Sequence, residues 1–203
     1  MARPNAGTKG VPRLDRESQI LEIASAQFGT DGFAGTSVAT IAEKAGISKP
    51  LIYNYFGSKE GLYEACLDRG GAIVAEEIER IARGDAVGIE RGMQTLGGMF
   101  TLLEPQPYLW RLFFDPTAPS TGPIADSVAL YADRIGKLAE EGVAELMTLA
   151  GNTDELDISA MTTVWLGIVD SLMDWWLDHP TETAEQMMQR CMRLLAALFG
   201  DSE

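Results

Sequence analysis

Apolar residues at helical spacing run through the whole 203-residue chain, and this pattern limits its fold more than any other feature. They recur three and four positions apart, and no segment alternates polar and apolar residues for long enough to indicate a β-strand. The pattern predicts an all-α protein. With 46% hydrophobic residues, the chain can bury a sizeable core, as one extended domain or two small ones.

Glycines and capping residues divide the pattern into separate helices. Ser37 and Ser48 can cap two short helices, and Gly46 and Gly57 can close them. Pro50 is tolerated because it falls in the first turn of the second short helix. The expected helices span about residues 15–28, 38–45, 49–56, 59–83, 85–103, 108–114, 124–150, 155–178 and 182–199.

The net charge of −14 is distributed unevenly along the chain. Residues 1–63 carry seven Lys or Arg and six Asp or Glu, a net charge of +1, which leaves −15 for the remainder. Affinity for nucleic acid depends on Lys and Arg side chains that neutralise phosphates. Only the N-terminal part of the chain could therefore accept a polyanion.

The stretch GISKPLIYNYFGSKEGL, residues 46–62, divides into two surfaces when it is wound into a helix. Each residue advances the helix by about 100°, which separates the aromatic side chains from one another. The inward side is expected to hold Leu51, Ile52, Tyr55 and Phe56, and the outward side Lys49, Pro50, Tyr53 and Asn54.

Two short helices joined by a tight turn at Gly46 are typical of a helix-turn-helix. In that motif the second helix enters the major groove of DNA. Asn54 can pair with adenine, Lys49 with guanine or phosphate, and Tyr53 can donate its hydroxyl to a phosphate. Lys59 adds a positive charge in the first turn of the next helix, where backbone N–H groups also favour an anion. A helical hairpin buried in a core would fit the same pattern.

Residues 20–62 resemble the DNA-binding domain of the TetR/AcrR family of bacterial transcriptional regulators. The matching segments are GFAGTSV at 32–38, IAEKAGIS at 41–48 and YNYFGSKEGL at 53–62, preceded by Ile20, Ala24 and Phe28. The resemblance implies a DNA-binding domain over 14–74, with its helix-turn-helix at about 37–56. A helical effector-binding and dimerisation domain would follow over 75–203.

The resemblance also implies which residues contact DNA. They are Thr36, Ser37, Lys49, Pro50, Tyr53, Asn54 and Lys59. Ala39 stands where some family members place a base-reading arginine, so readout would depend more on the recognition helix or on DNA shape.

Residues 1–13 form a basic segment that contains Gly and Pro. Arg3, Lys9 and Arg13, with Arg16 just beyond, resemble arms that enter the minor groove. A solvated tail without DNA contacts fits the same composition. No apolar run follows, so we expect no signal peptide or membrane anchor, and a cytoplasmic protein.

The segments 155–178 and 182–199 are apolar on nearly all sides, and one chain cannot easily cover both faces of each. The turn at His179 and Pro180 would make them a hairpin. Two such hairpins around a twofold axis would form a four-helix bundle, which is how the resembling family dimerises. A homodimer would place two recognition helices about one DNA turn apart and read a pseudo-palindromic operator.

The resemblance implies that the C-terminal domain binds a small-molecule effector. Aromatic and Met side chains suit a broad apolar ligand, and Asp170 could meet a cationic one. Each candidate also fits ordinary core packing. The candidates are Met93, Met99, Phe100, Trp110, Phe113, Phe114, Trp165, Asp170 and Met173.

These features predict a sequence-specific transcriptional regulator, most simply a repressor that releases its operator when a lipophilic effector binds. An activator, or a helical sensor without DNA binding, would fit the same sequence. An enzyme would not, because the chain lacks a phosphate-binding loop, metal-ligand spacing and a nucleophile elbow. We expect no cofactor and no metal, and we expect Cys66 and Cys191 to be buried thiols.

Overall fold

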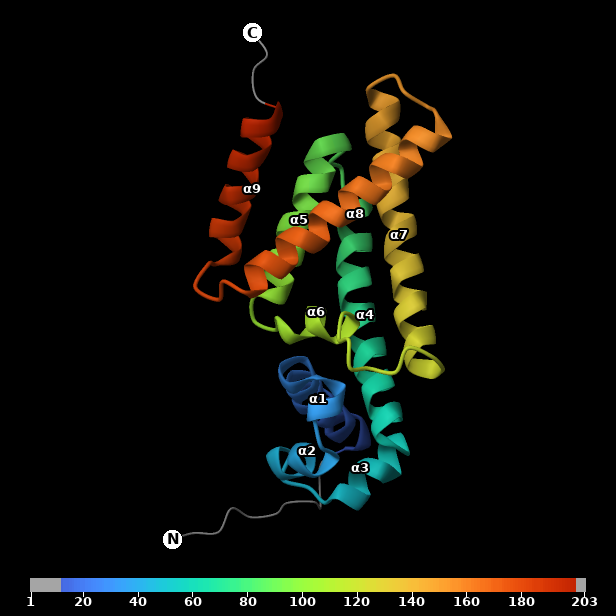
Figure 1. The fold of residues 1–203 in the computed structure, drawn as a ribbon, viewed down its shortest axis with the longest axis vertical. Helices are drawn as coiled ribbons and strands as arrows, with labels where there is room; N and C mark the ends of the chain where they lie inside the picture. The colour runs from blue at the N-terminus through green and yellow to red at the C-terminus, as the bar shows by residue number, and fades with distance from the viewer. Residues whose placement is uncertain (1–11, 200–203) are drawn as a thin grey trace. The chain divides into compact units, whose positions relative to one another are not determined.

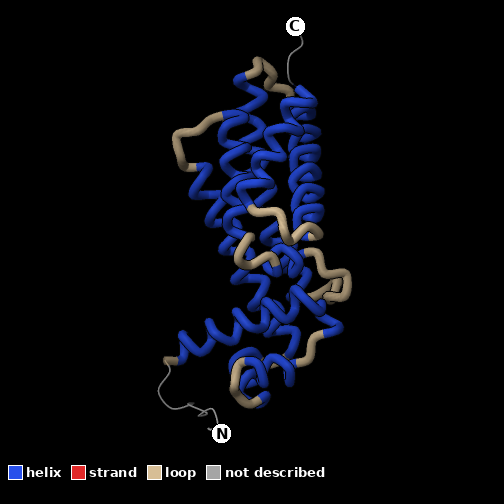
Figure 2. The backbone as a smooth tube through the Cα atoms, turned by 90° about the vertical axis from the view of Figure 1, so that its left-hand side faces the viewer, coloured by secondary structure: helices blue, strands red, loops and turns tan. Residues whose placement is uncertain are grey.

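The computed structural model describes residues 12–199, and the regular secondary structure in that range is entirely helical (Figures 1 and 2). The predicted all-α class is confirmed. Arg3 and Lys9 of the predicted arm lie outside the described residues. The helices are α1 (Arg13–Gly35), α2 (Val38–Lys44), α3 (Lys49–Phe56), α4 (Lys59–Ala82), α5 (Gly88–Leu103), α6 (Tyr108–Phe113), α7 (Pro123–Leu149), α8 (Glu155–Leu177) and α9 (Ala184–Phe199).

The chain forms two compact units that divide near the predicted boundary at residue 75, but Tyr108–Leu130 also joins the first unit. The first unit comprises the described residues up to Ala72 together with Tyr108–Leu130, and the second comprises Ile73–Pro107 together with the described residues from Tyr131 onward. Helix α6 and the first turns of α7 thus belong with α1, α2 and α3. Helix α4 contributes residues to both units.

Close backbone packing explains why α6 joins the first unit. Gly29 in α1 lies so near α6 that a Cβ atom there would be 2.6 Å from both the Cβ and the carbonyl oxygen of Tyr108. Only glycine permits this approach. The sequence predicted that the first helix ends near Gly29, but the helical path continues to a break at Gly32, where φ is 72°.

In the second unit, side chains rather than backbone approach two glycines of α5. Trp165 of α8 packs 3.6 Å from the Cβ position of Gly92, and Met188 of α9 packs 3.2 Å from that of Gly97. Phe100 meets Trp176 edge to face, with ring centroids 5.0 Å apart. The glycines weaken the intrinsic helix propensity of α5, but they let neighbouring helices pack closely against it.

Candidate DNA-binding surface

Helix α3 has the two predicted surfaces. The inward side holds Ile52, which is fully buried, with Leu51, Tyr55 and Phe56 half-buried beside it. Gly57, with φ of 75°, ends the helix, and its N–H donates to the carbonyl of Tyr53 at 2.8 Å. The outward side is exposed and consists of Lys49, Pro50, Tyr53 and Asn54.

The turn before α2 separates the roles of two neighbouring hydroxyl groups. Ser37 is exposed and caps α2, with its Oγ accepting from the Thr40 N–H at 3.1 Å. Thr36 is only 3% exposed, and its hydroxyl donates to the carbonyl of Gln27 at 3.2 Å. The Thr36 side chain therefore has no surface to offer DNA, which corrects the expectation from sequence. Its hydroxyl fastens the turn to α1 instead.

Three of the cations expected near DNA lie over aromatic rings. The ammonium of Lys59 is 4.4 Å from the ring centroid of Phe33, and that of Lys49 is 5.5 Å from the ring of Tyr53. The Arg13 guanidinium lies 5.4 Å from the ring of Tyr55. Such contacts contribute about 0.5–1 kcal/mol each at exposed sites and restrict where the cation points.

The N-terminus of α4 holds a carboxylate beside Lys59. Hydrogen bonds from the Glu60 backbone N–H and from the Ser58 hydroxyl, aided by the Lys59 charge, lower the pKa of Glu60 despite partial desolvation. The Ser58 Oγ also accepts from the Gly61 N–H at 3.0 Å. A phosphate approaching this helix end would therefore compete with Glu60 for its backbone N–H and would be repelled by its carboxylate.

The loop after α6 binds the break in α1. One oxygen of the Asp115 carboxylate accepts from the Phe33 N–H at 2.5 Å, and the Thr117 hydroxyl accepts from the Ala34 N–H at 3.0 Å. Burial favours the neutral acid at Asp115. Hydrogen bonds from the Thr117 hydroxyl and from the Phe33 and Thr117 N–H groups, with the Tyr63 hydroxyl dipole nearby, outweigh burial and lower the pKa of Asp115.

Tyr63 anchors the same loop from α4. Its side chain is completely buried, and its hydroxyl donates to the carbonyl of Leu112 at 2.7 Å. Burial, followed by the nearby Asp115 charge, raises the pKa of Tyr63. Neither Tyr63 nor Asp115 was among the residues singled out from the sequence, although the Asp-Pro-Thr run contains side chains that often bind backbone N–H groups.

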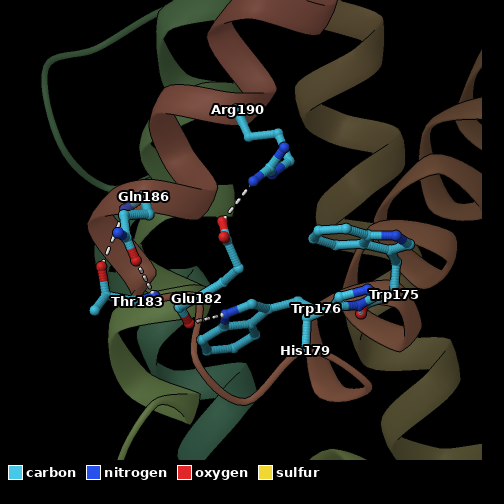
Figure 3. Close-up of polar contacts among 7 residues, drawn as sticks. All are labelled: Trp175, Trp176, His179, Glu182, Thr183, Gln186 and Arg190. Carbon is cyan, nitrogen blue, oxygen red and sulfur yellow. Dashed lines mark hydrogen bonds and ion pairs between the residues drawn. The ribbon is translucent and has the colours of Figure 1, made fainter.

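Helices α8 and α9 form a hairpin that is fastened at its turn (Figure 3). Thr183 and Gln186 cap α9 reciprocally, through bonds of 2.8 and 3.2 Å between side chain and backbone. Arg190 pairs with Glu182 at 2.7 Å and lies 5.0 Å from the ring centroid of Trp175. The turn predicted around His179 is therefore present and braced, and beyond the turn α9 packs against α5.

Each helix of the hairpin buries one face in its own unit and leaves apolar side chains on another. Val169, Met173 and Trp176 are buried in α8, and Met187 and Cys191 in α9. By length and composition alone α8 could cross a bilayer, although Asp170 and Asp174 interrupt it. The exposed apolar side chains of the two helices are Leu156, Met161, Val164, Ile168, Trp175, Met192 and Leu194.

The predicted effector-contacting residues are divided between the two units. Trp110, Phe113 and Phe114 belong to the first, and Met93, Met99, Phe100, Trp165, Asp170 and Met173 to the second. Phe100 and Met173 expose none of their surface and form core. Burial, followed by the charge of Asp174, raises the pKa of Asp170.

Comparison with known proteins shows which family model the α1–α4 region matches. Residues 20–66 match the family model described as bacterial regulatory proteins, tetR family. The chain belongs to the TetR family. This TetR-family chain is 26% identical over 184 residues to the HTH-type transcriptional activator FasR of Mycolicibacterium smegmatis, covering 87% of the chain and 80% of FasR. Other curated relatives, all named as transcriptional regulators, align over 27% to 36% of their own lengths.

Solved structures share the fold of this TetR-family chain over nearly its whole length. A TetR-like regulator from Rhodococcus superposes with a TM-score of 0.74 at 24% identity, covering 95% of this chain and all of its own. FadR from Bacillus subtilis, solved in complex with stearoyl-CoA, superposes with a TM-score of 0.73 at 18% identity, covering 91% of this chain and 98% of FadR. The family and its helix-turn-helix make this chain a DNA-binding transcriptional regulator.

Proposed function

We propose that this regulator reads a pseudo-palindromic operator through the outward side of α3. The observation that supports this most is the division of α3, where Ile52 is buried while Lys49, Tyr53 and Asn54 are exposed within the family-matched segment. An amide and a hydroxyl-bearing ring on one exposed helix face suit base edges and phosphates in a major groove. Ser37, Pro50 and Lys59 would flank this contact.

The proposed operator symmetry requires a homodimer, and the hairpin of α8 and α9 offers the surface for one. Met161, Val164, Ile168 and Trp175 follow one another at three-, four- and seven-residue intervals and are all exposed. An apolar stripe of this kind is typical of a protein–protein contact. We attribute the apolar character of α8 to this contact rather than to a membrane, and we place the protein in the cytoplasm.

The proposed effector is a lipophilic small molecule that binds the second unit and acts through α4. Aromatic and Met side chains of α5 and α8 favour an apolar ligand. FadR, which has the same fold, was solved with stearoyl-CoA, so a long acyl chain is the first class of ligand to examine. Coupling of about 1–3 kcal/mol would change DNA affinity 5- to 150-fold.

A repressor that releases DNA when the effector binds is the primary proposal. An activator is the second candidate, because FasR, which aligns over most of this chain, is named as an activator. In a repressor the effector lowers operator affinity, and deletion of the gene raises transcription from the neighbouring promoter. In an activator, deletion of the gene lowers transcription from that promoter.

Footprinting on the DNA beside the protein's own gene tests the proposal. The purified protein should protect a site with twofold sequence symmetry, and stearoyl-CoA should change that protection while coenzyme A alone does not. Absence of any protected site there would favour a helical sensor without DNA binding. Protection that no acyl-CoA alters would leave the operator proposal standing and remove the acyl chain as effector.

A further inference from the structure

The break at Gly32 leaves two backbone N–H groups that the helix cannot satisfy by itself. Residues that follow a non-helical position behave as a new helix N-terminus, whose first N–H groups have no partner four residues earlier. Asp115 and Thr117 accept from these groups at Phe33 and Ala34, across more than 80 residues of sequence. The α6–α7 loop thus caps α1 from outside.

The capping carboxylate is itself held in place. Its second oxygen accepts from the Thr117 N–H at 2.8 Å and from the Thr117 hydroxyl at 2.7 Å. The Tyr63 hydroxyl, which donates to the Leu112 carbonyl, also lies 3.4 Å from the carboxylate. The position of the Phe33 backbone is therefore set by a loop that is fastened to α4.

The side chain of Phe33 connects the backbone that Asp115 holds to the ammonium of Lys59. Its ring meets the Tyr63 ring edge to face, with centroids 5.2 Å apart, and the Lys59 ammonium lies over its face at 4.4 Å. Lys59 is half-buried and has no ion pair with Glu60 within 4 Å in the described part of the chain. The Phe33 ring is the aromatic group that its ammonium contacts.

We propose that Asp115 is a positioning residue for DNA binding, because it holds Phe33 so that the ring seats the Lys59 ammonium at the start of α4. Asp115 does not touch DNA in this account. The inference rests on the proposed function, in which Lys59 contacts a phosphate. It adds Asp115 to that function, although Asp115 lies 56 residues away in sequence from Lys59, the cation that it positions.

Asp115→Asn tests the proposal because two physical effects predict opposite changes in DNA affinity. Removing a negative charge from a DNA-binding protein should by itself raise DNA affinity. An amide side chain at position 115 would place its own N–H donors against the backbone N–H donors of Phe33 and Thr117. The cap would then fail, and the Phe33 ring would no longer hold the Lys59 ammonium in place. We expect affinity to fall about eightfold per protomer at 0.1 M salt, which is the effect of losing one phosphate contact with a salt slope of about 0.9.

Two further variants separate positioning from general loss of stability. Phe33→Leu removes the ring but keeps the N–H that Asp115 binds, and it should lower DNA affinity as Asp115→Asn does. In a Lys59→Ala background neither variant should lower affinity further. Asp133→Asn, an equal charge change at an exposed ion pair with Lys137, should leave affinity unchanged or raise it slightly.

A measurement without DNA makes the inference independent of the operator. In the wild-type protein the Phe33 ring current should shift the NMR resonances of the Lys59 Cε protons upfield, and Asp115→Asn and Phe33→Leu should both remove that shift. Persistence of the shift in folded Asp115→Asn would overturn the proposal, as would equal affinity losses with and without Lys59. If the shift behaves as expected but the wild-type protein binds no DNA, the proposed function fails while the positioning stands.

Discussion

Gly61 permits the close contact between the recognition helix and α4, and Gly61→Ala tests whether that contact sets the position of α3. A Cβ atom at Gly61 would lie 2.2 Å from the carbonyl oxygen of Phe56, the last residue of α3. Carbon–oxygen contacts normally begin at about 3.3 Å, so the end of α3 would have to move by roughly 1 Å. The obstacle is backbone, which cannot rotate away as a side chain could.

The magnitude follows from two opposing contributions to the free energy of unfolding. Alanine is about 1 kcal/mol more favourable than glycine inside a helix. Forced overpacking costs about 1–3 kcal/mol. Gly142→Ala in α7 is the matched control, because a Cβ atom there would meet nothing within 4 Å. It should raise stability by about 1 kcal/mol, and Gly61→Ala should be about 1–3 kcal/mol less stable than the control.

Urea unfolding of the two variants measures this difference, and competition binding measures its effect on DNA readout. A shift of the end of α3 displaces Tyr53 and Asn54, and loss of one bidentate base contact reduces discrimination by about 1–3 kcal/mol. Gly61→Ala should therefore lose preference for the operator over scrambled DNA, whereas Gly142→Ala should keep it. If both variants gain equal stability and bind the operator equally well, the close contact does not determine where α3 lies.

Three further predictions concern single side chains. Glu60→Gln should tighten binding to all DNA sequences, because Glu60 competes with phosphate at α4; unchanged affinity in a fluorescence anisotropy titration would contradict this. Asn54→Ala should relax preference at particular base pairs, while Lys59→Ala should weaken binding to every sequence and lower the salt slope by about 1; identical losses on all DNA would refute that assignment. Ile168→Glu should dissociate the proposed dimer in sedimentation experiments without lowering protomer stability, since Ile168 is 45% exposed; a wild-type monomer would exclude the proposed interface.

Local periodicity predicted the two surfaces of α3 because those surfaces depend only on the rotation of a helix. Ile52 and Asn54 are two residues apart, so a rotation of about 200° puts them on different sides whatever the rest of the chain does. The caps at Ser37 and Gly57 are equally local. For these residues the sequence contains all the information that determines the structure.

The location of α6 depends on a contact that no local pattern encodes. Gly29 reads as a helix-ending glycine in the sequence, but in the structure it is a helical residue that admits the backbone of Tyr108. Another long-range contact brings Asp115 to the Gly32 break, whereas the hydroxyl of the buried Thr36 bonds to the Gln27 carbonyl of α1. A sequence reader can recognise that Asp115 and Thr117 are capping residues, but cannot know that the N–H groups they cap lie 82 and 83 positions earlier.

The charge distribution predicts that the proposed positioning of a single lysine, Lys59, would have a large effect on DNA affinity. Residues 1–63 carry a net charge of +1 and the remainder −15, so the DNA-binding surface has no general excess of positive charge. At physiological salt the Debye length is about 8 Å, and phosphates therefore respond mainly to cations in their immediate vicinity. On α3 and the start of α4 those cations are Lys49 and Lys59. The two phosphate contacts per protomer that we propose would give a salt slope of about 2, so misplacing Lys59 would remove about half of the electrostatic affinity from this surface. On the proposed positioning, attraction to DNA in general would be weak, and operator affinity would depend on the Phe33 ring and the distant Asp115 carboxylate that keep Lys59 in place.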